Sequence, residues 1–205
     1  MHKTNSTKKQ AKIIRLFRKI HRITGAMLFV FFFIIASTGI LLGLKSNSNG
    51  LILPKTQQGA SSSLKNWLPI DSLHNKACEI LHDSISSNLS LELNRIDIRK
   101  NNGVAKFIFE KHLWEIQLDG TTGKLLQLKK RHSDLIEDIH DGTILDTYFN
   151  TSQTQIKVIY TLLMGFALLL FTITGFWLWY GPKKMRKNKQ RKSLQYNKIN
   201  QKQNS

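Results

Sequence analysis

The sequence contains little cysteine and few signatures of enzyme chemistry. Cys78 is the only cysteine, so no disulfide can form within the chain, and cysteine usage does not indicate the redox compartment. No serine or cysteine nucleophile motif, phosphate-binding glycine loop or HExxH pair is present. These absences argue against an autonomous hydrolase and against a nucleotide-dependent enzyme.

Charge is missing from two long stretches, residues 23–44 and 158–180. A helix of either length spans roughly 33 Å, and the hydrocarbon core of a bilayer is about 30 Å thick. Because a backbone in lipid must satisfy its own hydrogen bonds, we predict two transmembrane helices. The first run is too long for a signal peptide and follows a 22-residue tail, so we predict a retained anchor. Neither run contains an internal His, Asp, Glu, Lys or Arg, which argues against a proton relay and against a haem held in mid-membrane by the helices themselves.

Acidic residues are missing from both termini. Residues 1–22 carry eight Lys or Arg and residues 181–205 carry nine, which accounts for nearly all of the formal charge of +18. The positive-inside rule therefore predicts two cytoplasmic tails and an external segment at residues 45–157. We expect the tails to be disordered and to contact the lipid bilayer. We do not expect nucleic-acid binding, since no aromatic residues are interleaved with the charges.

The external segment is long enough for one small domain with its own core. Residues 45–63 are rich in Ser, Asn and Gly and are predicted to be a linker. Helical spacing of apolar residues begins at Ile70, and four runs with strand-like alternation follow. The predicted fold class is therefore a membrane α+β protein, in which two transmembrane helices flank one helix packed on a small antiparallel sheet. The predicted domain spans residues 64–131, its strands lie at 93–100, 104–110, 112–119 and 125–130, and an amphipathic helix with a connector fills 132–157.

Several motifs resemble one known family. The stretch WEIQLDGTTGKLLQL is similar to the end of a PepSY domain, whose hairpin carries a V-D-x-x-T-G-K pattern; the matching residues are Asp119, Thr122, Gly123 and Lys124. HRITG and ASTGILLG in the first apolar run, IHDGTIL before the second and TGFWLWYGPKK at its end resemble the PepSY-associated transmembrane family. Together these motifs cover most of residues 18–184.

The resemblance implies a bacterial inner-membrane protein with a PepSY-like periplasmic domain. Larger members have four membrane helices, and some are linked to siderophore uptake or to ferric reduction through haem. PepSY domains elsewhere are thought to inhibit or chaperone peptidases. This chain has only two helices and fewer candidate ligands, so a reductase activity does not transfer directly.

Two histidines are candidate haem b ligands, and each has a simpler interpretation. His21 precedes the first apolar run, where an interfacial cation needs no special purpose; His140 lies near the end of a short predicted helix, where its cation is mildly favoured. The predicted topology puts them about a bilayer thickness apart, so one chain cannot place both on one haem. Haem binding would require a homodimer or a second protein.

Other residues suggest helix packing or a metal. Gly39 and Gly43 form a GxxxG pattern, which permits either a homodimer or packing of the first helix on the second in the same chain. His74, Cys78 and His82 follow at helical spacing, so adjacent members could share a metal, although Cys78 is most simply a small residue at the edge of the core.

Three functional interpretations remain. The first is a non-enzymatic accessory or binding module of the cell envelope that binds a membrane or periplasmic protein, in iron, siderophore or haem handling. The second is a haem b electron-transfer subunit, resembling a ferric reductase, with His21 and His140 as ligands; this is the enzymatic alternative, a haem-dependent membrane oxidoreductase. The third is a peptidase inhibitor or chaperone that acts through residues 64–131 alone.

Overall fold

A computed structural model describes residues 3–149, 151 and 154–203 of the chain. The outermost residues of both predicted tails (1–2 and 204–205) and part of the predicted connector (150, 152–153) lie outside the described residues. The chain divides into two compact units, residues 1–33 with 152–205 and residues 34–151. Each unit is described by itself below.

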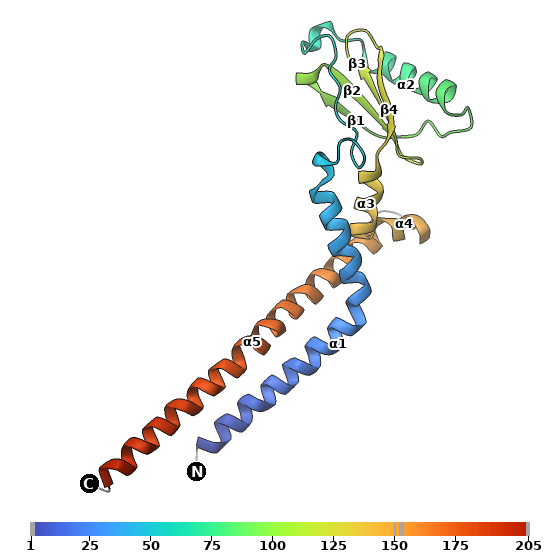
Figure 1. Cartoon of the computed structure of the whole chain (residues 1–205). Coiled ribbons are helices and arrows are strands. Elements are labelled where there is room, and N and C mark those ends of the chain that lie inside the picture. The colour runs from blue at the N-terminus through green and yellow to red at the C-terminus, as the bar shows by residue number, and fades with distance from the viewer. Residues whose placement is uncertain (1–2, 150, 152–153, 204–205) are drawn as a thin grey trace. The chain divides into compact units, whose positions relative to one another are not determined.

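The first unit is an antiparallel pair of long helices, α1 (Lys3–Gly43, which continues into the second unit) and α5 (Gln155–Gln203) (Figure 1). The contacts follow the antiparallel direction: Phe17 in the first half of α1 stacks on Trp177, and Phe31, later in α1, lies near Tyr160 in the first turns of α5. The seam between the helices is close-packed because small residues lie along it. Gly181, for example, is buried, and a Cβ there would come within 2.9 Å of Ile14.

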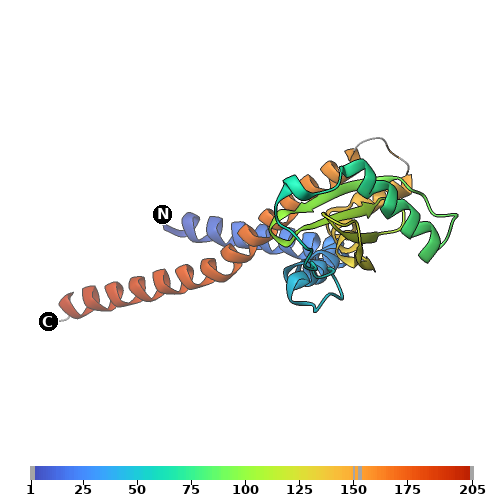
Figure 2. The same ribbon diagram turned by 90° about the horizontal axis from the view of Figure 1, so that it is seen from above.

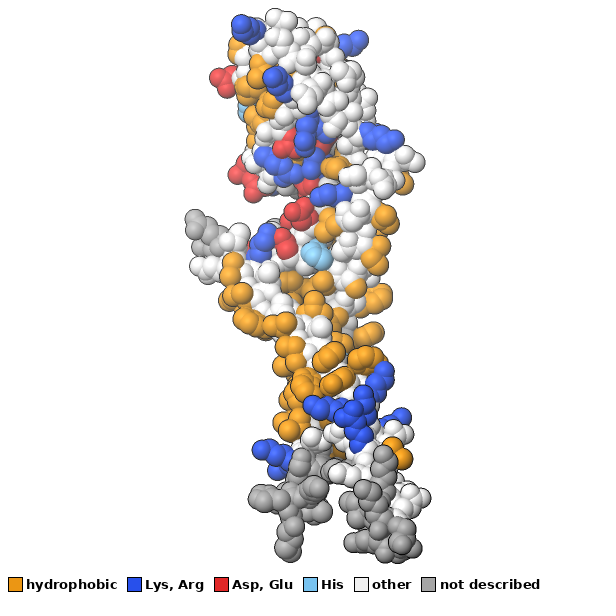
Figure 3. Space-filling model, turned by 90° about the vertical axis from the view of Figure 1, so that its left-hand side faces the viewer, with side chains coloured by type: hydrophobic (Ala, Val, Ile, Leu, Met, Phe, Trp, Pro, Cys, Tyr) orange, Lys and Arg blue, Asp and Glu red, His pale blue; other side chains and the backbone are white. Residues whose placement is uncertain are grey.

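Both helices are long and apolar enough to cross a membrane. Large apolar side chains, such as Met27, Phe29 and Phe166, are exposed along them. Figure 3 shows hydrophobic side chains covering the helices, with Lys and Arg side chains gathered beyond them. A surface of this kind is stable when lipid covers it, which agrees with the two predicted transmembrane helices.

The expectation of disordered tails is wrong for the described residues. α1 begins at Lys3, twenty residues before the first apolar run, and α5 continues through the second tail to Gln203. Helix nucleation is the costly step, and adding residues to an existing membrane helix is not. Lys and Arg, which are common in both tails, are good helix formers and extend it.

The second unit contains a four-stranded antiparallel sheet in the order β1-β2-β3-β4 (Figure 2). The strands are β1 (Leu93–Arg99), β2 (Val104–Phe109), β3 (Trp114–Asp119) and β4 (Leu125–Lys130), each close to a predicted strand. Helix α2 (Ile70–Ser84) packs on one face, as its apolar spacing predicted. The core between them is fully buried and consists of Leu73, Ala77, Leu81, Ala105, Phe107, Phe109, Ile116 and Leu118. The predicted fold class is confirmed.

The segment expected to be a linker is ordered against the sheet. The amide of Gln57 donates to the side chain of Gln117 at 2.9 Å, and the side-chain amide of Gln117 donates back to the carbonyl of Lys55 at 2.9 Å. Further along, the amide of Gly59 donates to the carbonyl of Asn102 at 2.7 Å. Residues 55–60 therefore lie along the sheet and are bonded to it, and we call this segment the strap. Short 3-10 turns occur at η1 (Lys45–Asn47), η2 (Leu64–Asn66) and η3 (Lys100–Asn102).

Two short helices follow the sheet, α3 (His132–Asp141) and α4 (Thr143–Phe149). Gly142 separates them with φ at 82°, a left-handed conformation that glycine adopts without steric cost and that commonly ends a helix. The predicted helix over SDLIEDIHD and its end at Gly142 are thus both present. On α4, Tyr148 and Phe149 are exposed and contact each other edge to face.

Candidate functional site: two histidine–threonine pairs

His21 lies in the seam of the helix pair. Its Nδ1 is 2.9 Å from the Oγ1 of Thr174 on α5, and its ring stacks on Phe171 with the centroids 3.9 Å apart. Gly175 follows Thr174, and a Cβ built there would be 3.4 Å from Cε1 of His21. The ring is therefore held by an aromatic face and a hydrogen bond, whereas a purely interfacial cation would extend toward the headgroups.

His140 is held in the same way within the second unit. Its Nδ1 is 2.9 Å from the Oγ1 of Thr38 on α1, a residue that is 8% exposed. Gly39 follows Thr38, and a Cβ built there would be 3.5 Å from Cε1 of His140. Both histidines thus approach a Thr-Gly dipeptide on another helix, through the same ring nitrogen and at the same distance.

Each threonine hydroxyl contacts both a histidine nitrogen and a backbone carbonyl of its own helix. Thr174 donates its hydroxyl proton to the carbonyl of Leu170 at 2.8 Å, and Thr38 donates its own to the carbonyl of Ile34 at 2.7 Å. A hydroxyl has one proton, so in the arrangement in which that proton goes to the carbonyl, the oxygen accepts from the histidine and the ring carries its proton on Nδ1. The Nε2 atom then holds a free lone pair. This is the tautomer that a metal-ligating histidine adopts when a hydrogen bond fixes its other nitrogen.

The arrangement fits a haem axial ligand on the chemistry of its donor atoms. A neutral imidazole with a free Nε2 and an anchored Nδ1–H is the protein ligand of most b-type haems. Each ring lies beside a glycine, so no side chain at that position competes for space next to the imidazole. Each pair offers one such ligand per chain.

The three residues spaced along α2 are arranged differently. His82 Nε2 bonds to the carbonyl of Leu89 at 3.2 Å, whereas His74 stacks on Phe107 with centroids 6.1 Å apart. Cys78 packs against the core, and burial, together with nearby Glu79, raises the pKa of its thiol. Within the described residues, no three His, Cys, Asp or Glu side chains gather as a metal site.

The two glycines of the GxxxG pattern lie in different environments. Gly39 faces the ring of His140, as described above. Gly43 has no other described atom within 4 Å of the position its Cβ would take. The structure therefore connects the first glycine with a candidate ligand.

The four residues of the PepSY-like turn build the β3–β4 hairpin. The carboxylate of Asp119 accepts from the amides of Thr121 and Thr122 at 2.7 and 3.0 Å, and Gly123 has φ at 67°. The amide of Asp119 then donates to the carbonyl of Lys124 at 2.9 Å. Burial raises the pKa of the Asp119 carboxyl, but these amides and that of Ala60 in the strap outweigh it and hold the pKa below its ordinary value. The motif thus forms the turn and ties it to the strap.

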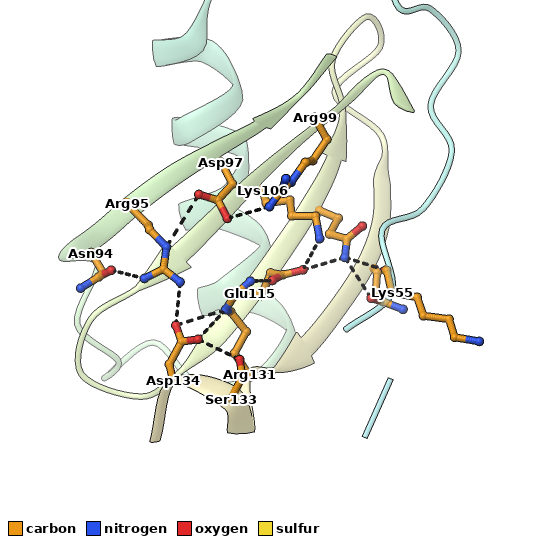
Figure 4. Close-up of polar contacts among 12 residues, drawn as sticks. Lys55, Asn94, Arg95, Asp97, Arg99, Lys106, Glu115, Arg131, Ser133 and Asp134 are labelled. Atoms are coloured by element: carbon orange, nitrogen blue, oxygen red, sulfur yellow. Dashed lines mark hydrogen bonds and ion pairs between the residues drawn. The ribbon is translucent and has the colours of Figure 1, made fainter. Parts of the chain in front are cut away.

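A buried ionic network lies on the sheet face opposite α2 (Figure 4). Glu115, which is 1% exposed, accepts from Lys106 at 3.4 Å, from Gln117 at 2.6 Å and from Arg131. Arg131 also pairs with Asp134 in the first turn of α3 at 3.1 Å. The alternation of β2 and β3 puts these polar side chains on one face and the apolar core on the other.

The network continues to the edge of the sheet. Arg95 of β1 donates to Asp134 at 2.9 Å, and it also lies 3.7 Å from Asp97. Burial raises the pKa of Asp134, but Arg131, Ser133 and Arg95 outweigh it and hold the pKa below its ordinary value. Burial lowers the pKa of Lys106 despite the neighbouring Glu115. These bonds link β1, β2, β3 and α3, and they connect the sheet to the helix that carries His140.

The sequence contained a signal for the missed partners. Thr38-Gly39 and Thr174-Gly175 repeat one dipeptide in both apolar runs. A buried threonine in a membrane helix bonds its own backbone and still offers a lone pair to a neighbour. Which histidine would meet which threonine depends on the tertiary structure.

The fold and these pairs define an integral membrane protein that carries a small extramembrane α+β domain. The family profile for the PepSY-associated TM region matches residues 2–181 of the chain. The chain therefore belongs to the PepSY_TM family, as its motifs indicated. No curated protein and no solved structure matches it.

Proposed function

We propose that this protein is a haem b electron-transfer subunit of the bacterial inner membrane, with the Nε2 atoms of His21 and His140 as axial ligands. The observation that carries the proposal is the repeated geometry, in which each ring places Nδ1 2.9 Å from the hydroxyl of a buried threonine that also bonds a backbone carbonyl of its own helix. A histidine that serves only as a cation at the membrane interface does not account for two pairs with the same geometry in two separate units.

The topology in this proposal follows from charge. The basic ends of α1 and α5 lie in the cytoplasm, and the sheet domain lies in the periplasm. His21 then serves the cytoplasmic side of the membrane and His140 the periplasmic side. A haem held by these histidines would supply one-electron redox chemistry, taking the electron from a reductant and passing it to an oxidised acceptor such as a ferric complex.

A homodimer completes both sites. Each chain offers one histidine on each side of the membrane, so a second copy supplies the second axial ligand in both places. The threonines act as positioning residues, since they hold the ring orientation and raise the basicity of Nε2. Loss of such a partner lowers metal affinity by roughly 10- to 100-fold in other sites.

The test is the reduced-minus-oxidised absorption spectrum of the full chain, purified in mild detergent after expression with added haem. We expect a haem b signal in the wild-type protein. His21→Ala alone and His140→Ala alone should each reduce this signal by about half, because each histidine serves one of two sites. His82→Ala is the matched control, since its ring bonds a backbone carbonyl of the sheet domain. Absence of the signal, or full retention in both variants, would overturn the proposal.

Substitutions of Thr174 test whether its hydrogen bond positions His21 as a ligand or is an incidental contact. Thr174→Ser keeps the hydroxyl and should keep the haem, whereas Thr174→Val removes the acceptor and should lower haem retention and shift the reduction potential. Two differently tagged copies expressed together should co-purify with haem. A haem signal in a monomer would instead point to a ligand from elsewhere.

A second candidate function is the binding of an extended peptide by the sheet domain. Among the described residues, β1 pairs with β2 only, so its outer edge offers unpaired backbone groups that can add a strand from a partner. Ile98 on this strand is 42% exposed. A photo-crosslinker placed at Ile98 should capture a partner that one placed at the exposed Lys111 does not. Capture of a peptidase would favour the inhibitor interpretation, and equal capture from both positions would contradict edge binding.

A further inference from the structure

The membrane-helix unit has an unusual charge composition. Residues 1–33 and 152–205 contain no Asp or Glu, although they include both basic tails. The Lys and Arg side chains of this unit therefore have no Asp or Glu side chain of their own unit to pair with.

A groove between the two helices gathers two of these cations over an apolar floor. It has a volume of about 260 Å³ and is lined by Ala11, Ile14, Arg15 and Arg18 of α1 and by Pro182 and Met185 of α5. Arg15 and Arg18 are three residues apart, so both guanidinium groups project from one face of α1. Both are exposed at the groove, whereas Ile14 and Met185 are partly buried within it.

The shape of the groove has a local cause. Gly181 permits Ile14 to approach α5 closely at this point. The next residue, Pro182, lies inside α5 and lacks an amide proton, so one backbone hydrogen bond of the helix is lost there. The groove is shaped by the close contact at Gly181 and by the neighbouring Pro182. It lies where the apolar part of the helices meets the basic tails.

We propose that this groove binds the headgroup of an anionic phospholipid. The planar guanidinium groups of Arg15 and Arg18 match the geometry of a phosphate and bind it through paired hydrogen bonds. Ile14, Pro182 and Met185 contact the glycerol and the start of the acyl chains. Basic pockets between membrane helices on the cytoplasmic side bind anionic headgroups in other proteins. The inference does not depend on haem binding, because none of these residues belongs to the histidine pairs.

The test is native mass spectrometry of the full chain in detergent, titrated with dioleoyl phosphatidylglycerol or dioleoyl phosphatidylcholine. We expect the first phosphatidylglycerol to bind at least about tenfold more tightly than phosphatidylcholine, because two arginines face its phosphate. Arg15→Gln with Arg18→Gln should abolish most of this preference. Lys187→Gln with Lys189→Gln removes the same charge from exposed positions outside the groove and should leave the preference within about twofold.

Three results would overturn the proposal. Equal weakening by the arginine pair and the lysine pair would show diffuse attraction to anionic lipid. Equal affinity for the two lipids would show that the phosphate charge is not recognised. Full displacement of the lipid by millimolar inorganic phosphate would assign the groove to free phosphate. Arg15→Lys with Arg18→Lys keeps the charge without the planar fork, and it should bind with intermediate affinity.

Discussion

Replacement of Glu115 by Gln tests the buried network of the sheet domain. Glu115 and Lys106 are 1% and 2% exposed, and Arg131 is 7% exposed. The substitution keeps the size of the side chain and removes its charge. Two buried cations then lose their shared carboxylate, although Arg131 keeps its pair with Asp134.

The expected cost follows from burial. Removal of one partner from a buried ion pair typically costs about 3–5 kcal/mol, because the remaining charge stays desolvated. Glutamine still offers one acceptor, so we expect about 3 kcal/mol here, which is more than a 100-fold change in the unfolding equilibrium. Glu92→Gln is the matched control. It breaks a pair with Lys111 at 2.9 Å in which both side chains are more than half exposed, and we expect no measurable loss.

Hydrogen exchange of the full chain in detergent measures this cost where it arises. The peptides that contain β2 and β3 should exchange more than 100-fold faster in Glu115→Gln, and at the wild-type rate in Glu92→Gln. Replacement of both Lys106 and Glu115 by Met should restore much of the protection, because a well-packed apolar pair costs little where an ion pair was buried. Wild-type exchange in Glu115→Gln would refute the assignment of the network as a structural connection.

Three further predictions concern the same domain. The native state holds the pKa of Asp134 below its ordinary value of 3.8, because the neighbouring guanidinium groups outweigh burial. The charged carboxylate therefore stabilises the domain fully above that value, and this stabilisation is lost as the pH falls through the lower native pKa. The thermal unfolding temperatures of wild type and Asp134→Asn, measured over a pH series, should converge in acid. Burial raises the pKa of Cys78, so N-ethylmaleimide at neutral pH should label the folded chain much more slowly than the unfolded chain, and equal rates would contradict this. Gly120→Ala puts a Cβ 2.2 Å from the indole of Trp67 and should destabilise the domain by about 1–3 kcal/mol in denaturant titrations, whereas Gly43→Ala, with open space, should not.

The sequence predicted the parts of the fold that depend on local pattern. Uncharged length predicted both membrane helices, and alternation at Ile96 and Ile98 predicted β1 close to its observed bounds. Asp119 and Gly123 predicted the β3–β4 turn, because their turn chemistry acts over a few residues. Such signals do not require knowledge of the tertiary structure.

The sequence indicated the histidines of the candidate site but not the threonines that they contact. His21 was a candidate because it precedes an apolar run, and His140 because it lies in a motif of the family that the chain resembles, but their partners lie 153 and 102 residues away. The network around Glu115 was missed for the same reason, since a Lys and a Glu on neighbouring strands resemble a solvated sheet face until the strap and Arg131 cover them. Contacts made between distant segments do not leave a local pattern.

The haem content of the purified dimer tests the central claim most directly. The pyridine haemochromogen assay, combined with the protein concentration, gives the number of haem b groups per chain. The proposal predicts one per chain in the wild-type protein and none when His21→Ala and His140→Ala are combined. A wild-type chain that binds no haem when haem is supplied, or a double variant that keeps its haem, would contradict it.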